Sequence, residues 1–185
     1  MFDPNTLEQV QFAYFASKYG HAKQVRDSGG RYFDHPKGAA WIYIYELGGR
    51  DPRIINDLLL HDIREDTYLL SSYRISLNFN KDVALDVRAL TKLPRGKETL
   101  LQYLQRMVDR GREVITAKLC DKLHNVRTLS GWSPEKRKCY AEETQEHYLS
   151  VLIPALRAYG SQWAIDADKL EKKIKEALGP YLTEN

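Results

Sequence analysis

The stretch that decides the fold is residues 54–66, Ile54-Ile55-Asn56-Asp57-Leu58-Leu59-Leu60-His61-Asp62-Ile63-Arg64-Glu65-Asp66. Its first half is mostly apolar and predicts a buried helix, whereas five of its last six side chains are ionisable. On one continuous helix, turning about 100° per residue, His61, Asp62, Glu65 and Asp66 would project into one sector. Buried carboxylates without partners are costly, so this sequence predicts that a positively charged group or ion compensates their negative charge.

A divalent metal ion is the compensating partner that these residue types favour, because imidazole and carboxylate are ligands for zinc, manganese and iron. His61 and Asp62 are adjacent and do not form the His-x-x-x-His pair of zinc proteases. A complete site therefore needs ligands from other helices. Two segments offer them, residues 32–36 and 117–125.

The second of these segments continues into a polar stripe. Asp121, Asn125 and Thr128 are separated by steps of four and three, so they share one helix face. Apolar neighbours such as Leu119 and Leu123 indicate that this helix is buried.

Taken in order, these segments resemble the HD-type hydrolase domain of the RelA/SpoT homologues, and especially the small alarmone hydrolases that consist of that domain alone. A His-Asp pair by itself is a weak signal, but the ordered set is specific. The resemblance covers about residues 10–160 and rests on residues 26–36, 60–67, 90–93 and 118–129, and more weakly on Glu143-Thr144.

The resemblance implies a role for each matching position. The ligands of one divalent ion, typically manganese, would be His35, His61, Asp62 and Asp121. The acidic pair acting on the attacking water would be Glu65 and Asp66. The residues holding the nucleotide would be Arg26, Ser28, Asn125 and Thr128.

The implied reaction is hydrolysis of the 3′-pyrophosphate of alarmone nucleotides such as ppGpp, with water attacking the 3′-linked phosphorus and pyrophosphate leaving. The bifunctional relatives continue into a synthetase domain, whereas this chain ends at Asn185. We therefore expect it to degrade alarmones and not to make them.

Three alternatives stay open at this point. Asp27 stands where relatives usually carry lysine, and a carboxylate there would suit adenine's amine, which favours adenosine alarmones of the ppApp type. The HD core could also serve as a phosphatase for another nucleotide, such as a mononucleotide or NADPH. A catalytically silent nucleotide-binding or antitoxin partner is the third, although the intact Glu65-Asp66 pair weighs against it.

Several residues have ordinary structural explanations as well. His21, His124 and His147 are expected to be structural histidines, not ligands. Arg26 taken alone would be a surface residue of a glycine-containing loop. Arg64, which replaces a small apolar residue of the family pattern, could line the cleft and meet a phosphate or point at a neighbouring helix.

The positions of helix-capping residues, glycines and prolines along the chain, with no sustained strand-like alternation, predict an all-α, single-domain HD-type helical bundle over residues 1–185. Gly48-Gly49 ends one helix, and Asp51 with Pro52 begins the next. A final helix is expected over residues 161–178, ended by Gly179-Pro180.

Composition agrees with a small globular enzyme. The 185 residues are 43% hydrophobic and 29% charged, with a net charge of +3, too mild to indicate a nucleic-acid-binding protein. No run approaches the ~18 apolar residues of a membrane span. Two cysteines without CxxC spacing and a start without a signal peptide favour the cytoplasm. The expected partner is a small nucleotide; the sequence gives no oligomeric state.

Overall fold

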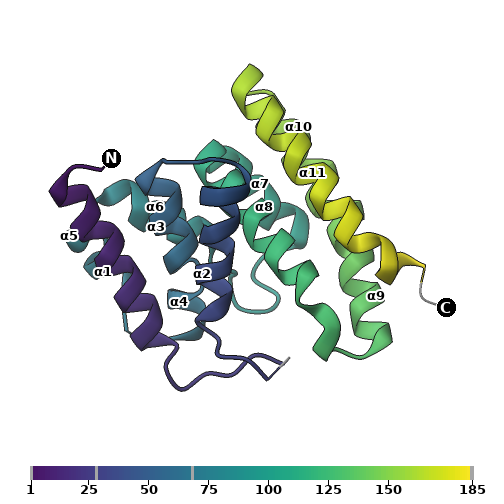
Figure 1. The fold of residues 1–185 in the computed structure, drawn as a ribbon, viewed down its shortest axis with the longest axis horizontal. Helices are drawn as coiled ribbons and strands as arrows, with labels where there is room; N and C mark the ends of the chain where they lie inside the picture. Colours follow the sequence, from purple (N-terminus) through teal and green to yellow (C-terminus); the bar gives the residue numbers. More distant parts are fainter. Residues whose placement is uncertain (1, 28, 68, 184–185) are drawn as a thin grey trace.

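A computed structural model describes residues 2–27, 29–67 and 69–183, and Figure 1 shows an assembly of helices. The all-α class is confirmed: within these ranges, β pairing is limited to an isolated antiparallel bridge between Val25 and Arg31. The α-helices are α1 (Pro4–Gly20), α2 (Asp34–Trp41), α3 (Pro52–Leu60), α4 (Ile63–Asp66), α5 (Ser72–Asn78), α6 (Lys81–Leu90), α7 (Leu100–Arg110), α8 (Arg112–Arg127), α9 (Pro134–Glu143), α10 (Ser150–Arg157) and α11 (Ser161–Leu182). Shorter turns are the π-helical η1 (Ile42–Glu46) and η3 (Thr144–Leu149) and the 3₁₀ turn η2 (Leu129–Gly131).

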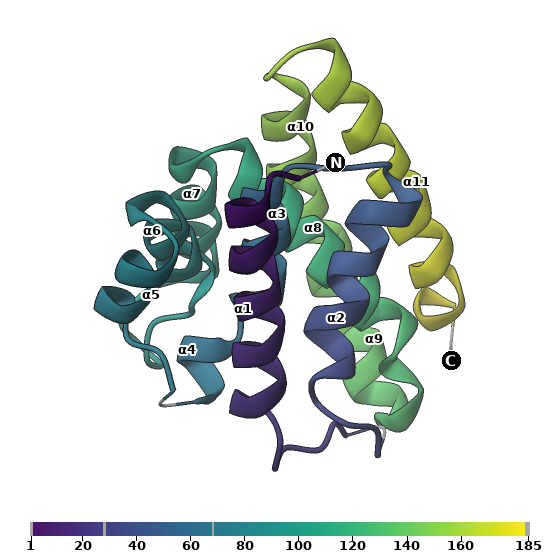
Figure 2. The same ribbon diagram turned by 60° about the vertical axis from the view of Figure 1, so that its left-hand side comes forward.

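Helix α8 occupies the middle of the molecule. Figures 1 and 2 show it surrounded, and it packs against α2, α3, α6, α7, α10 and α11. Every residue from Val114 to Leu123 is buried, including the polar Lys118, Asp121 and Lys122. A helix buried all round brings its polar side chains into the interior, where they must find partners.

The helix starts follow from side-chain caps that the sequence makes visible. Asp51 precedes α3 and accepts a hydrogen bond from the Arg53 amide at 2.8 Å, with Pro52 in the first turn. Thr99 and Gln102 form a reciprocal capping box at the start of α7. The predicted start at Asp51-Pro52 is therefore confirmed.

The expected continuous helix through residues 54–66 is wrong in one respect: it breaks between α3 and α4, at His61 and Asp62. The His61 ring donates from Nδ1 to the Leu58 carbonyl at 2.8 Å. That carbonyl would accept from the Asp62 amide in an unbroken helix. The side chain of His61 thus binds the Leu58 carbonyl at the point where the helix breaks.

The last helix also differs from expectation, because α11 continues past Gly179 to Leu182 with Pro180 inside it. A proline so near the end removes only one backbone hydrogen bond, so the helix survives it. None of the helices in the described ranges combines the length and the apolar character that crossing a bilayer requires.

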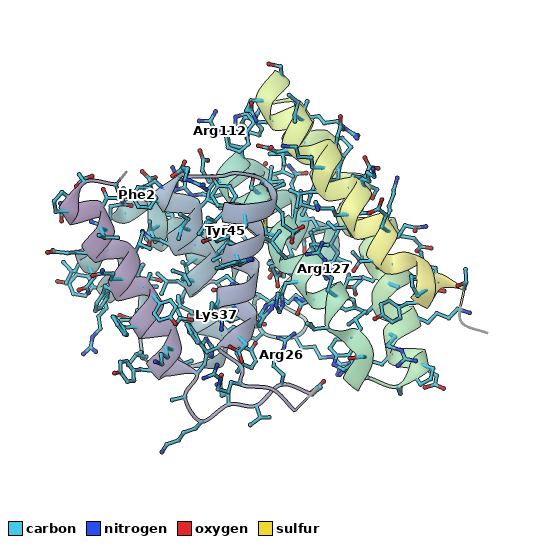
Figure 3. The ribbon with its side chains drawn as sticks, viewed as in Figure 1. Phe2, Arg26, Lys37, Tyr45, Arg112 and Arg127 are labelled. Atoms are coloured by element: carbon cyan, nitrogen blue, oxygen red, sulfur yellow. The ribbon has the colours of Figure 1, made fainter. Side chains whose placement is uncertain are left out.

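Glu46 links three parts of the bundle. It closes η1 and forms ion pairs with Arg127 at the end of α8 and with Lys173 of α11, the latter at 2.8 Å (Figure 3 labels Arg127). The pKa of Glu46 is lowered to about 2, mainly by the hydrogen bond from Arg127. Burial opposes this shift, but the hydrogen bonds from Arg127 and Lys173 together outweigh it. The ionised carboxylate is therefore favoured in the folded protein.

Replacing Glu46 with Gln should lower the free energy of unfolding by about 1–2 kcal/mol near pH 7, allowing for partial exposure of the pair. A carboxylate whose pKa is lowered by folding stabilises above its unfolded pKa and loses this effect on acidification. The gap between wild type and E46Q should thus close as the pH falls from about 4.5 to 2. Urea denaturation across this range measures it, with the exposed Glu176→Gln as control; a gap independent of pH would contradict the assignment.

Candidate active site

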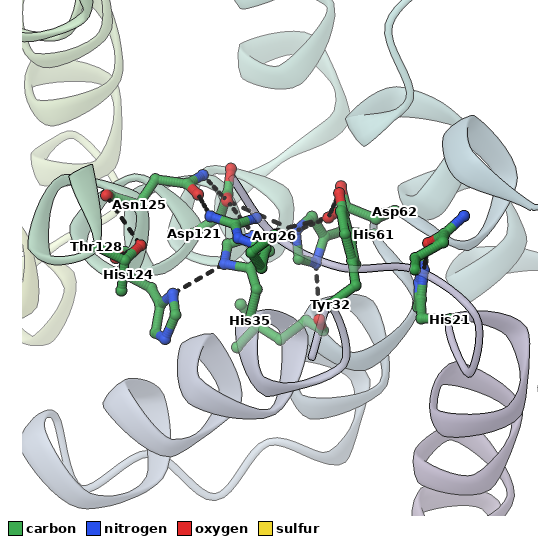
Figure 4. A network of polar contacts seen from close by, with 12 residues as sticks. His21, Arg26, Tyr32, His35, His61, Asp62, Asp121, His124, Asn125 and Thr128 are labelled. Carbon is green, nitrogen blue, oxygen red and sulfur yellow. Dashed lines mark hydrogen bonds and ion pairs between the residues drawn. The ribbon is translucent and has the colours of Figure 1, made fainter. Parts of the chain in front are cut away.

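Two histidines and two aspartates from four elements point at one another (Figure 4). His35 lies in the first turn of α2, His61 caps α3, Asp62 precedes α4, and Asp121 lies on α8. His35 Nε2 is 3.1 Å from His61 Nε2 and 3.0 Å from Asp121 Oδ1. Asp62 Oδ2 is 3.2 Å from His61 Nε2 and 3.6 Å from His35 Nε2. The structure therefore brings these four side chains from distant segments together.

These separations suit a shared cation. Ligand atoms bound about 2.1 Å from one ion stand roughly 3.0–3.4 Å apart in octahedral or tetrahedral arrangements. The ligand atoms of His35, His61 and Asp62 all lie within 4.8 Å of one another, and Asp121 Oδ1 adds contacts of 3.0 and 3.6 Å to the two imidazoles. Two nitrogens and two oxygens form a donor set that manganese, zinc and iron accept.

The tautomers of the two histidines support the same conclusion. Because the His61 Nδ1 proton is donated to the Leu58 carbonyl, a neutral His61 presents a lone pair at Nε2. His35 Nδ1 lies 2.9 Å from His124 Nδ1. If His35 donates that proton to His124, its Nε2 lone pair faces the Nε2 of His61, and only a positive charge between them makes that arrangement favourable.

The electrostatics of the buried cluster show the same need for positive charge. Burial lowers the pKa of His61, but Asp62 and Asp121 outweigh it and raise the value well above normal. Burial alone would raise the pKa of Asp121; Lys118 and the two imidazoles hold it well below normal. Lys118 Nζ lies 2.8 Å from Asp121 Oδ2 and keeps its charge, whereas burial lowers the pKa of Lys122 well below normal.

One member of the acidic pair expected to act on water, Glu65, lies beside this cluster. Glu65 is exposed on α4, and its Oε2 accepts a hydrogen bond from the Lys92 amide at 3.1 Å. It lines a cleft of about 160 Å³ together with Asp62 and Asp121. Asp66 ends α4, but its side chain lies outside the described part of the chain.

The residues expected to hold a nucleotide are brought together in part. Arg26 donates to Asn125 Oδ1 at 2.7 Å, and Asn125 donates to Asp121 Oδ1 at 2.6 Å. Ser28 lies outside the described residues. Thr128 donates its hydroxyl to the carbonyls of His124 and Asn125, so this proton is not directed at the cluster.

A second hollow, of about 200 Å³, adjoins the cluster on this side and shares Arg26, Tyr32, Asn125 and Tyr140 with the first. Its wall includes Trp132. Asp27 also lines it, but its Oδ2 accepts a hydrogen bond from Lys136 at 2.8 Å. The acceptor proposed for adenine is thus already engaged by a lysine.

Three side chains that support the cluster were not anticipated. Tyr32 donates to Asp62 Oδ2 at 3.0 Å, Lys118 pairs with Asp121, and His124 contacts His35. The pair of Lys118 with Asp121 is separated by three residues on one helix, and that spacing was the available signal for it. The contacts of Tyr32 and His124 join distant segments, so the sequence carried no local signal for them. Of the other histidines, His21 is buried against Tyr32 apart from the cluster (Figure 4) and His147 is exposed.

Comparisons with known proteins agree with this geometry. The chain is 37% identical over 153 residues, 79% of its length, to a GTP pyrophosphokinase of Streptomyces antibioticus. It is 37% identical over 151 residues to a guanosine-3′,5′-bis(diphosphate) 3′-pyrophosphohydrolase of Aquifex aeolicus, covering 78% of this chain and 21% of that protein. It is 34% identical over 151 residues to the bifunctional (p)ppGpp synthase/hydrolase SpoT of Escherichia coli, covering 77% of this chain and 21% of SpoT.

The chain thus spans about a fifth of the length of the curated relatives it matches, with shares of 18%, 21% and 21%. A solved structure of a metazoan ortholog of SpoT, described as hydrolysing ppGpp, shares the fold with a TM-score of 0.70 at 23% identity. The likeness covers 94% of this chain and 97% of the other, which confirms the all-α fold. No protein-family model matches the sequence.

His124 should matter for metal binding although it is not a ligand in this arrangement. Replacing it with Phe keeps the ring but removes the acceptor for His35, and loss of such a supporting bond typically lowers metal affinity about 10–100-fold. Gly38→Ala should act similarly, because a Cβ there would lie 2.2 Å from His124 Nε2 and displace the ring. Calorimetric titration with Mn²⁺ measures both, and exposed His147→Phe is the control. Unchanged affinity in both variants would refute the supporting role.

Proposed function

We propose that the chain is a metal-dependent hydrolase of the RelA/SpoT homologue type that removes the 3′-pyrophosphate of guanosine alarmones such as ppGpp. The observation that carries the proposal is the convergence of His35, His61, Asp62 and Asp121 beside Glu65, in a chain similar to named 3′-pyrophosphohydrolases.

We propose that His35, His61, Asp62 and Asp121 hold one divalent ion, with Mn²⁺ as the expected occupant. When bound, such an ion supplies Lewis acidity that makes water a better nucleophile and neutralises charge on phosphoryl oxygens. Four protein ligands leave open positions in an octahedral shell for the substrate and water. Tyr32 and Lys118 fix the two carboxylates through their hydrogen bonds.

Glu65 acts as the general base in this proposal, because it lines the cleft and stays outside the ligand cluster. It takes a proton from the attacking water as the water oxygen bonds to the 3′-linked phosphorus. The bond between that phosphorus and the ribose O3′ breaks, and O3′ takes up the proton that Glu65 received from the water. The products from ppGpp are the nucleoside 5′-diphosphate with a free 3′-hydroxyl and pyrophosphate. Asp66, beside Glu65 in the sequence, is proposed as its acidic partner.

The nucleoside is proposed to occupy the hollow next to Arg26 and Asn125, with Ser28 and Thr128 completing its surroundings. Trp132 and Tyr140 offer ring surface to a base there. Because Asp27 is engaged by Lys136, we propose guanosine alarmones as the main substrates and adenosine alarmones as secondary ones. We place the activity in the cytoplasm, where such nucleotides occur and where free thiols such as buried Cys120 persist.

The decisive experiment identifies the products from ppGpp with Mn²⁺ present. Wild type should release pyrophosphate, whereas Glu65→Gln should lower kcat at least 100-fold because it removes the base. Mn²⁺ binding by calorimetry should stay within about twofold, since Glu65 is outside the ligand cluster. Glu142→Gln, on exposed α9, is the matched control. Release of orthophosphate would indicate a phosphatase, full activity of E65Q would refute its role, and silence of the wild type would favour the binding alternative.

A further inference from the structure

A third hollow, of about 690 Å³, opens on the other side of the metal cluster, where α4 faces the end of α6 and the loop after it. It shares Glu65 and Lys92 with the cleft over the cluster. Its other charged walls are Arg64 and Arg88. The three hollows therefore form a row joined by shared wall residues, in which the cleft over the cluster adjoins both of the others.

Of the two arginines on the wall of this hollow, Arg64 is partly buried and Arg88 is exposed. Among the described side chains, neither Arg64 nor Arg88 forms an ion pair with a carboxylate. The contrast is Arg106 nearby, which pairs with Glu98 at 2.8 Å and donates to three backbone carbonyls. Burial, and then the charge of Arg88, lower the pKa of Arg64, as expected when two cations face one hollow without an anion.

Glu65 is the carboxylate described on this wall, and its Oε2 accepts from the Lys92 amide, a backbone group. The hollow thus offers two guanidinium groups and the Lys92 side chain for an external anion. Guanidinium groups bind phosphate oxygens in pairs and are weakly hydrated, so they suit a phosphoryl group.

We propose that Arg64 and Arg88 form a subsite for the distal phosphate of the 3′-pyrophosphate, a role that rests on the proposed function. With the base beside Arg26 and the reacting phosphorus over the cluster, the outer phosphate of a substrate lying along this row reaches Arg64 and Arg88. The subsite therefore selects a 3′-diphosphate over a 3′-monophosphate. After the P–O3′ bond breaks, pyrophosphate still carries the distal phosphate, so the same arginines retain the product.

The kinetic test compares Arg64→Ala and Arg88→Ala with wild type. Each should lower kcat/KM for ppGpp about tenfold or more, the size expected for one charge-assisted phosphate contact. Inhibition by guanosine 5′-diphosphate 3′-monophosphate, which lacks the distal phosphate, should stay within twofold. Arg74→Ala, an exposed arginine on neighbouring α5, removes the same charge outside the hollow and should change neither value.

The binding test titrates inorganic pyrophosphate and orthophosphate into the Mn²⁺-loaded proteins by calorimetry. Both arginine variants should weaken pyrophosphate about tenfold and orthophosphate less than twofold. If wild type hydrolyses ppGpp and both variants match it in pyrophosphate affinity and KM, the subsite is overturned and the proposed function stands. If wild type is inactive on nucleotides but binds pyrophosphate in an arginine-dependent way, the subsite stands and the proposed function fails. Circular dichroism confirms that each variant is folded.

Discussion

The constraint on which the rest of the structure depends is the burial of two carboxylates between two imidazoles that face each other. Asp62 and Asp121 approach His35 and His61 within 3.0–3.6 Å, at a place where α2, α3, α4 and α8 meet. Such a cluster is favourable only with added positive charge, and neighbouring groups are arranged around that need. Lys118 balances one carboxylate, Tyr32 donates to the other, and the remaining lone pairs converge on one point.

Much of this could be predicted from the sequence because it depends on local patterns. Asp51 with Pro52 marked the start of a helix, and His61 with Asp62 after an apolar run marked a buried polar site. The ordered segments identified His35 and Asp121 as the distant partners. Each of these signals depends only on a few residues that are neighbours in the sequence, so it does not require knowledge of how the helices pack.

What could not be predicted depends on contacts between helices. The break after Leu60 coincides with a hydrogen bond from the His61 ring to the Leu58 carbonyl, and the cluster around Nε2 favours that ring position. From the sequence, His124 was expected to be a structural histidine. In the fold it lies beside His35 of α2, and its ring packs against Gly38, where a side chain would leave no room. Arg64 had two explanations in sequence, and only the fold shows that it shares the wall of one hollow with Arg88 of α6.

The hydrogen bond from His61 to Leu58 has a consequence for dynamics. The same ring that faces the cluster with Nε2 binds the Leu58 carbonyl with Nδ1, at the break between α3 and α4. A cation that binds Nε2 would hold the ring in this position and so stabilise the local structure at the break by mass action. Occupancy of the proposed ion site and local backbone opening would then be linked equilibria, and the hydrogen-exchange protection of the amides around Asp62 would report on that occupancy.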